Sequence, residues 1–192
     1  MTVLYLVRHA HADWTPDEDR PLSAKGCADA QRVADLLQTC PISAVYSSPF
    51  RRARETVAPL AIRLGLPIHE IDSLRERELG TGPTDSFVTA VQATWEDPSF
   101  VWPGGESNGA AQRRGVEVIQ GLVDRYPGQQ IAVGTHGNLL VLILQHFDPS
   151  VGFAFWQSLT MPDVYRLEVT DGRATCHRLW QPPAEIGDNQ VK

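Results

Sequence analysis

The stretch VLYLVRHAHADW, from Val3 to Trp14, joins an apolar run to a cluster of arginine, histidine and aspartate. A short continuous run of Val, Leu and Tyr is typical of a strand covered on both faces, such as a central strand of a largely parallel sheet. Open α/β sheets bind ligands at the carboxyl ends of their strands. The cluster therefore lies where such a sheet would hold a reacting group, although a polar loop after a strand is the simpler interpretation.

Strands alternate with apolar or amphipathic helices along the rest of the chain, with no repeat or low-complexity segment. This alternation predicts an α/β fold, a three-layer α/β/α sandwich with a mostly parallel central sheet. The length predicts a single domain, residues 1–192, with a small insertion at about 81–104 and a loose tail at about 182–192. The predicted strands are 3–7, 44–46, 66–71, 131–134, 164–169 and 174–179, and the predicted helices follow the caps Ser23 and Ser48 and span 85–95, 108–125 and 139–147.

The composition argues against several classes of partner. With 17 Lys and Arg against 23 Asp and Glu the formal net charge is -6, so nucleic acid and anionic membranes are not expected partners. Cys27, Cys40 and Cys176 are odd in number and far apart, so we expect reduced, mostly buried thiols rather than disulfides or a zinc site. The first residues carry neither a basic segment nor a long apolar stretch, so we expect a cytoplasmic protein.

The ends of three predicted strands carry conspicuous polar groups. Arg8 and His9 follow the first strand, Arg52 follows the second, and His136 follows the fourth. In a parallel sheet these ends share one edge, so side chains that are distant in sequence would meet there. The helices beginning behind Ser48 and His136 would add free backbone N–H groups and the positive ends of their dipoles. The sequence therefore predicts an anion site at this edge.

Phosphoryl transfer is the reaction that these residue types favour. Neutral imidazole has an unprotonated nitrogen that can attack phosphorus and carry the phosphoryl group. Guanidinium groups clamp phosphate oxygens through paired hydrogen bonds. The leaving alcohol needs a proton from an acid, and the segment LRERELG, residues 74–80, offers Glu76 and Glu78. Glu76 could instead be a surface ion-pair member beside Arg75 and Arg77.

Six short segments, spread from Val3 to about Leu144, carry a more specific signature. They are LVRHAHADW, PLSAKGCADAQ, SSPFRRARET, LRERELG, WPGGES and GTHGN. In this order they resemble the histidine phosphatase superfamily, and in particular its phosphoglycerate-mutase-like branch, with Ala10 where that family usually has glycine. The resemblance implies the three-layer fold of the phosphoglycerate mutases and a metal-independent phosphatase.

Carried onto this sequence, the resemblance implies a covalent phosphohistidine and a small phosphorylated metabolite as substrate, with no metal or cofactor. His9 would be the nucleophile, and Glu76 rather than Glu78 the acid that protonates the leaving oxygen and then activates water. The arginine directly before alanine in the SSPFRRARET segment is Arg52, so Arg51 is not the match. The implied catalytic residues are His9, Glu76, His136, Arg8 and Arg52, and the substrate-binding residues are Arg8, Arg52, His136, Thr15 and Gly137.

Alternative functions stay open at this point. A mutase must return the phosphoryl group before water arrives and needs a well-closed site, whereas the modest segment between Gly80 and Gly104 favours open access and hydrolysis. A non-catalytic phospholigand-binding module would keep the pocket without attack by histidine. The pair His9 and His11 could also chelate a metal in a barrel hydrolase, although the chain is short for a barrel. His11 and Thr15 stand where glutamate and asparagine are common in the mutase branch, so the substrate stays open, as does a homodimer.

Overall fold

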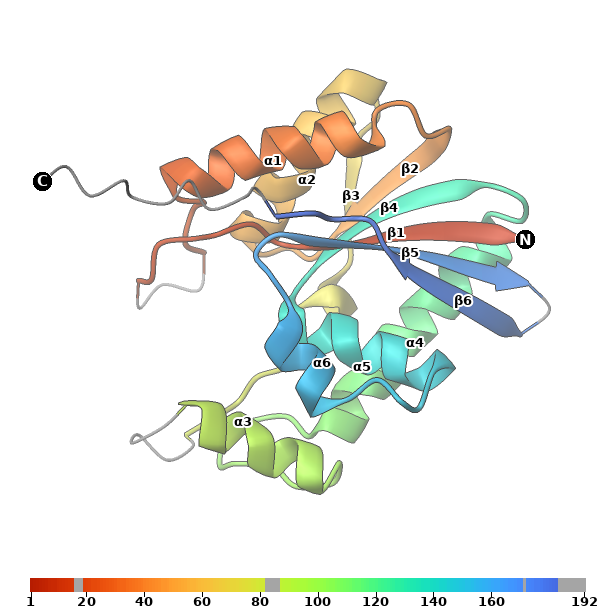
Figure 1. Ribbon diagram of the computed structural model, residues 1–192. Coiled ribbons are helices and arrows are strands. Elements are labelled where there is room, and N and C mark those ends of the chain that lie inside the picture. Colours follow the sequence, from red (N-terminus) through yellow and green to blue (C-terminus); the bar gives the residue numbers. More distant parts are fainter. Residues whose placement is uncertain (16–18, 82–86, 171, 183–192) are drawn as a thin grey trace, which may run out of the picture.

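The computed structural model describes residues 1–15, 19–81, 87–170 and 172–182, and these form one six-stranded sheet with helices on both faces (Figure 1). Across the sheet the strands are β3 (Ile68–Glu70), β2 (Ile42–Ser47), β4 (Gln130–Thr135), β1 (Thr2–Arg8), β5 (Asp163–Thr170) and β6 (Arg173–Arg178). The first four are parallel, β5 pairs antiparallel with β1, and β6 pairs antiparallel with β5. The predicted α/β sandwich with a mostly parallel sheet is confirmed. The predicted loose tail lies almost entirely outside the described residues.

The helices fall close to their predicted ranges. The helix α4 has the predicted bounds, Asn108–Arg125, and α3, Phe87–Glu96, lies inside the predicted insertion. The sequence pattern does not predict the 3-10 turn Asp72–Leu74 or the short helix α6, Phe153–Ser158. The remaining helices are α1 (Ala24–Leu37), α2 (Arg51–Leu64) and α5 (Gly137–Phe147).

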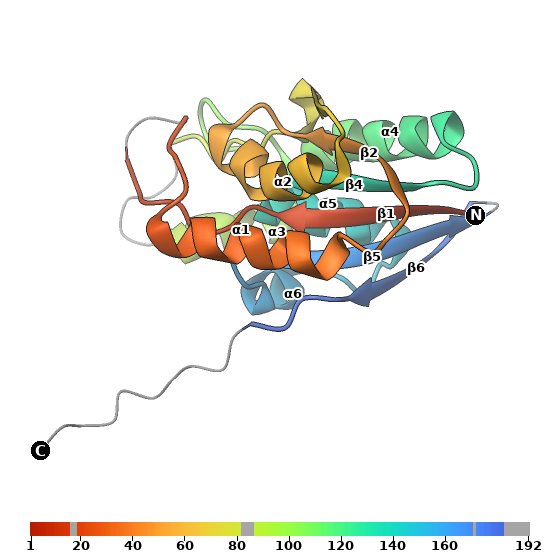
Figure 2. The same ribbon diagram turned by 90° about the horizontal axis from the view of Figure 1, so that it is seen from above.

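The central strand β1 is buried on both faces because its side chains alternate between two core regions. Val3, Tyr5 and Val7 belong to the core beneath α1 and α2. Leu4 and Leu6 belong to the core beneath α4 and α5. The two pairs of helices cover opposite faces of the sheet (Figures 1 and 2). Burial on both sides accounts for the continuous apolar run at the start of the chain.

The carboxyl ends of β2, β4 and β1 lie side by side. In the sheet register Arg8 pairs with Thr135, and Ser47 pairs with Gly134. The ladder continues one residue further, because the His9 N–H donates to the Thr135 carbonyl at 2.9 Å and the Ser48 N–H donates to the Gly134 carbonyl at 2.9 Å. This register brings the residues that follow three separate strands to one edge.

The predicted start of α2 is wrong by two residues. Phe50, not Ser48, is the N-cap residue, and its side chain makes no capping hydrogen bond. The Ser48 hydroxyl lies instead 2.8 Å from Nε2 of His136. The same hydroxyl accepts from the Phe50 N–H at 3.3 Å, so Ser48 keeps a local contact before α2 in addition to its contact across the sheet edge. The predicted cap of α1 is confirmed, since the Ser23 hydroxyl accepts from the Gly26 N–H at 3.1 Å.

The expectation of mostly buried cysteines is also wrong. The three thiols are free, but Cys27 and Cys176 are exposed and Cys40 is only half-buried. Cys27 lies on the outer face of α1, whereas Ala30 and Val33 face the core. Cys176 lies on β6, whose other neighbour is solvent because this strand forms the edge of the described sheet. Neither thiol has a place in the core.

Candidate active site

His9 lies directly after β1 and is fixed through backbone hydrogen bonds. The adjacent Ala10 N–H donates to the Thr56 hydroxyl at 2.9 Å, and that hydroxyl donates to the Arg52 carbonyl at 2.7 Å. Together with the bond from the His9 N–H to the Thr135 carbonyl, this chain links β1, β4 and α2. The loop that carries His9 and the first turn of the helix that carries Arg52 therefore form one rigid unit.

The ring of His9 is a neutral imidazole of defined tautomer. Its Nδ1 lies 2.7 Å from the Ala10 carbonyl oxygen. A carbonyl can only accept, so Nδ1 carries the proton and Nε2 keeps its lone pair. Burial, followed by the nearby charges of Arg52, Arg8 and Arg20, lowers the pKa of His9 to about 3, against an opposing effect of the Ala10 bond. The nitrogen Nε2 is therefore unprotonated at physiological pH.

His136 lies beside His9 at the end of β4. The two ring centroids are 5.2 Å apart, and His136 is fully buried. Its Nε2 is bonded to the Ser48 hydroxyl, while its Nδ1 is buried without a hydrogen-bond partner among the described residues. Burial, and after it the neighbouring His9 and Arg52, holds the pKa of His136 well below its usual value. Both rings are thus uncharged side by side.

Two arginines from the predicted set approach these rings from different elements. Arg52 is only 5% exposed, and its guanidinium carbon lies 4.6 Å from the ring centre of Phe50. Arg8 donates from Nη1 to the Thr160 carbonyl at 3.1 Å. A Cβ atom on Gly137 would lie only 2.9 Å from Nε of Arg8, so glycine at this position makes room for the guanidinium. The absence of a side chain at Gly137 therefore leaves space for the guanidinium of Arg8.

The carboxylate of Glu76 is held by three backbone N–H groups. Its Oε1 accepts from Arg77 at 2.9 Å and from Leu139 at 3.0 Å, and its Oε2 accepts from Asn138 at 3.0 Å. The expectation that the start of α5 offers free N–H groups to an anion is therefore wrong for Asn138 and Leu139, because Glu76 occupies them. These backbone bonds, rather than an ion pair with a neighbouring arginine, orient Glu76.

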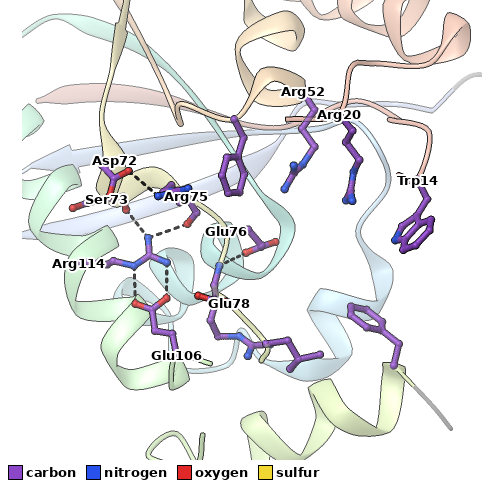
Figure 3. Close-up of a pocket in the computed structure, with 14 residues that line it drawn as sticks. Trp14, Arg20, Arg52, Asp72, Ser73, Arg75, Glu76, Glu78, Glu106 and Arg114 are labelled. Carbon is purple, nitrogen blue, oxygen red and sulfur yellow. Dashed lines mark hydrogen bonds and ion pairs between the residues drawn. The ribbon is translucent and has the colours of Figure 1, made fainter. Parts of the chain in front are cut away.

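A cavity of about 890 Å³ is lined by two residues of the predicted site, Arg52 and Glu76, whereas Arg8, His9 and His136 are not among its described lining residues. Arg20, Arg52 and Glu76 line it, and in the close-up of Figure 3 their side chains point into the same space. Trp14 and Phe87 also line the cavity and are 79% and 64% exposed, so its rim is open to solvent. The cavity joins positively charged side chains to a carboxylate at an accessible sheet edge.

Three residues at the site were not predicted as site residues from the sequence. Ser48 was given a capping role, although its position after β2 matches that of His136 after β4. Arg20 has a buried Nε without a partner in the described part of the chain, and it contributes to lowering the pKa of both histidines. Arg77 lines the cavity although its neighbours suggest a surface ion pair. No local pattern marks Arg20 or Arg77, because burial by distant segments decides their role.

Glu106, whose role the sequence leaves open, lines the cavity. Thr15, like His9, is not among the described lining residues, so its contact with phosphate stays a prediction. Glu106 forms a two-point ion pair with Arg114, with both N···O distances 2.7 Å. Arg114 also donates to the carbonyls of Ser73 and Arg75 at 2.7 and 2.9 Å. This pair holds in place the segment that leads into Glu76.

His11 is engaged in packing the start of α1. Its Nδ1 lies 2.8 Å from the Ser23 hydroxyl, and its carbonyl accepts from the Ser23 N–H at 3.0 Å. A Cβ atom on Gly26 would lie 2.0 Å from that carbonyl, so the contact requires glycine. Across the described ranges, no group of three or more His, Cys, Asp or Glu side chains is placed to hold a metal ion. The geometry gives no support to the barrel-hydrolase alternative.

The fold and the cavity define an α/β enzyme with paired histidines and arginines at the carboxyl edge of its sheet. The chain belongs to the histidine phosphatase superfamily (branch 1), whose family model matches residues 4–181. It is therefore an enzyme of the histidine phosphatase type. Within the described ranges, every helix is too short or too polar to cross a membrane.

Individual relatives agree with this assignment. The chain is 25% identical over 150 residues to the uncharacterized phosphatase PhoE of Bacillus subtilis, covering 75% of this chain and 76% of that protein. It is 29% identical over 194 residues to phosphoglycerate mutase-like protein 4 of Arabidopsis thaliana, covering 92% and 84%. The solved structure of YhfR from Bacillus stearothermophilus superposes with a TM-score of 0.76 at 28% identity, covering 91% and 95%.

Proposed function

We propose that this protein hydrolyses small phosphate monoesters through a covalent phosphohistidine on His9. The observation that carries the proposal is the state of the His9 ring. The Ala10 carbonyl fixes the proton on Nδ1, and a pKa of about 3 keeps the ring neutral, so Nε2 is available as a nucleophile. A buried imidazole beside several guanidinium groups is suited to attack on an anionic phosphoryl group.

In the first step, Nε2 of His9 bonds to phosphorus and the bond from phosphorus to the ester oxygen breaks. Arg8 and Arg52 neutralise the charge on the phosphoryl oxygens. If the Ser48 hydroxyl donates to Nε2 of His136, Nδ1 of that ring carries a hydrogen and donates to one of these oxygens. Glu76 enters this step in its protonated form and gives the proton to the leaving oxygen, which departs as an alcohol and leaves Glu76 as a carboxylate.

In the second step, water attacks the phosphorus of the phosphohistidine. Glu76, now a carboxylate, takes a proton from the water, and the bond from nitrogen to phosphorus breaks. Inorganic phosphate leaves, and the neutral ring of His9 is restored. The groups are supplied by the chain alone, so we propose no metal or cofactor for this reaction.

Hydrolysis is favoured over mutase action by the rim of the cavity. Trp14 and Phe87 are largely exposed there, so the cavity lined by Arg52 and Glu76 is open to water. A mutase has to exclude water while the phosphoryl group is on the enzyme. One relative is named a phosphatase and another is named phosphoglycerate mutase-like, so both activities belong in the test. The substrate that we propose is a small molecule in the cytoplasm, not nucleic acid or a membrane lipid.

The proposal is tested by comparing two reactions of the purified protein. Release of phosphate from p-nitrophenyl phosphate is measured beside the isomerisation of 3-phosphoglycerate, with and without a bisphosphate primer. We expect phosphate release to be the faster reaction. Isomerisation that outpaces hydrolysis would assign the protein as a mutase. Binding of inorganic phosphate without turnover of either substrate would assign it as a phospholigand-binding module.

A further inference from the structure

The Ser48 hydroxyl lies between a backbone donor and the ring of His136. Ser48 is fully buried, and its Oγ accepts from the Phe50 N–H at 3.3 Å and lies 2.8 Å from Nε2 of His136. If Nε2 carried a hydrogen, the hydroxyl would receive two donors, and its own hydrogen would be buried without an acceptor in the described part of the chain, which is costly. With Nε2 bare, every hydrogen in this group has an acceptor. The contact therefore runs from the hydroxyl to Nε2.

Both partners of this contact are held in place. The Ser48 N–H donates to the Gly134 carbonyl at 2.9 Å, which ties the serine to the end of β4. The His136 ring makes edge contacts with the rings of His9 and Phe50, and both centroids lie 5.2 Å from its own. The hydroxyl and the imidazole therefore meet in one fixed arrangement.

The hydrogen bond at Nε2 decides the state of the other ring nitrogen, because a neutral imidazole has only one ring hydrogen. Burial, and after it His9 and Arg52, holds the pKa of His136 well below its usual value, so the ring is neutral. With Nε2 as the acceptor, the hydrogen is on Nδ1, which is buried without a partner among the described residues. In water the histidine ring favours the opposite form, with the hydrogen on Nε2. The surroundings of His136 must therefore supply the preference for Nδ1.

We propose that Ser48 is a positioning residue, which fixes the hydrogen of His136 on Nδ1 and so makes that nitrogen a donor to a phosphoryl oxygen. The catalytic part of this inference rests on the proposed function, in which the two arginines and His136 hold the phosphoryl group. In the opposite tautomer, Nδ1 would present a lone pair to the same oxygen and repel it. Ser48 acts through His136 and does not itself touch the substrate.

The direct test reads both ring nitrogens of His136 by nitrogen NMR in the ligand-free protein at neutral pH. The nitrogen that carries the hydrogen resonates upfield of the bare nitrogen, and the two signals are assigned by their loss in His136→Gln. We expect hydrogen on Nδ1 in the wild-type protein and a shift towards hydrogen on Nε2 in Ser48→Ala. Hydrogen on Nε2 in the wild-type protein, or an unchanged ring in Ser48→Ala, would overturn the inference.

Kinetics measure what the tautomer contributes to the reaction. Loss of one preorganised donor to a developing charge costs about 10²- to 10³-fold in rate. Ser48→Ala should lower kcat/KM for p-nitrophenyl phosphate by less, about 10- to 100-fold, because the ring still adopts the favourable tautomer part of the time. Ser48→Thr keeps the hydroxyl and should keep both the Nδ1 hydrogen and most of the activity. A fall in kcat/KM without any change of tautomer would assign Ser48 a packing role and overturn the inference.

The matched control is Ser47→Ala, which removes the neighbouring buried hydroxyl. The Ser47 hydroxyl donates to the Ser48 carbonyl at 2.9 Å rather than to the ring. This variant should therefore keep the wild-type tautomer and the wild-type kcat/KM. A change of tautomer as large as that in Ser48→Ala would show that the ring responds to any local loss of packing, which would also overturn the inference.

A titration with inorganic phosphate separates this inference from the proposed function. Phosphate should shift the Nδ1 signal of His136 in the wild-type protein and should bind Ser48→Ala more weakly. A shift of this signal supports the inference even if the protein turns over no substrate and the proposed function fails. An Nδ1 signal that does not move at saturating phosphate overturns the inference even if the protein hydrolyses phosphate esters.

Discussion

The carboxyl edge of the parallel strands and the β5–β6 hairpin handle buried charge in opposite ways. In the hairpin, Asp163 is fully buried and fully engaged. Its oxygens accept from Nε and Nη2 of Arg178 at 2.9 and 2.7 Å and from the N–H groups of Thr160 and Val164 at 3.0 and 3.1 Å. At the carboxyl edge, Nε of Arg8, Nδ1 of His136 and two nitrogens of Arg77 have no partner among the described residues.

This difference separates structural charge from charge that is reserved for a ligand. A satisfied buried ion pair fixes one geometry, whereas an unsatisfied buried donor is available to a ligand or to water. The two regions are connected, because the Thr160 carbonyl accepts from Arg8 while the Thr160 N–H donates to Asp163. The hairpin therefore holds one of the arginines that the proposed reaction uses. The predictions below test each side of this division.

The largest effect is expected from removing the nucleophile. His9→Ala should lower kcat for p-nitrophenyl phosphate by about 10⁴-fold or more, as when the central member of a catalytic group is lost. The same variant should lose the acid-labile label that a radioactive phosphate donor leaves on the wild-type protein. The label is measured after denaturation, with Arg51→Ala as a labelled control at an exposed position. Undiminished labelling of His9→Ala would show that another residue carries the phosphoryl group.

The acid is tested by the dependence on the leaving group. Glu76→Gln should slow alkyl phosphates by about 10²- to 10⁴-fold, the usual contribution of general acid catalysis. It should slow p-nitrophenyl phosphate much less, since nitrophenolate leaves without a proton. Glutamine still accepts N–H bonds from Asn138 or Leu139, so the loop keeps part of its anchoring. Equal slowing of both substrates would argue that Glu76 only holds the loop.

In the β5–β6 hairpin, removal of the buried carboxylate of Asp163 should lower the stability of the protein. Asp163→Ala leaves the buried N–H groups of Thr160 and Val164 and the guanidinium of Arg178 without their acceptor. We expect the free energy of unfolding in urea to fall by about 3 kcal/mol. The control is Arg51→Ala, which removes an exposed ion pair with Glu55 and should leave the free energy of unfolding almost unchanged. Equal losses in both variants would remove the distinction between the two regions.

Local patterns were sufficient to predict most of the fold. The two-sided burial of β1 follows from its continuous apolar residues, and the bounds of α4 follow from its turn signals. The short α6 was missed, and none of its residues is buried. The start of α2 was misplaced by two residues because Ser48 satisfies a capping pattern and still accepts from the Phe50 N–H, although the helix begins only after Phe50.

The site could be predicted only as far as the strand ends define it. His9 and His136 each follow a strand directly, and Arg52 lies in the first turn of the helix after β2, so the parallel sheet brings them together. The anchoring of Glu76 by α5 and the burial of Arg77 depend on how segments distant in sequence pack, and a charged residue between two others looks like an exposed one. The roles of Glu76 and Arg77 can be recognised only from a structure, which shows their burial and their hydrogen-bond partners.

The most gradual of the predicted effects is the pH dependence of stability. The pKa of His9 is lowered to about 3 by burial and neighbouring guanidinium groups, and that of His136 is lowered in the same direction. In the unfolded chain a histidine has a pKa near 6.5. The unfolded state therefore binds more protons below this pH, so these two residues contribute stability that is present above pH 6.5 and is lost as the pH falls towards 3.

The expected loss is about 1.4 kcal/mol per pH unit for each histidine once the unfolded state is fully protonated. It is measured by urea unfolding at several values between pH 7 and 5. His136→Gln should reduce the slope by the share of one group, whereas His146→Gln, at an exposed position, should keep the wild-type slope. Identical slopes in all three proteins would mean that His136 takes up a proton in the folded state. In that case only the ring of His9 would be uncharged, whereas the proposed phosphoryl site requires both His9 and His136 to be neutral.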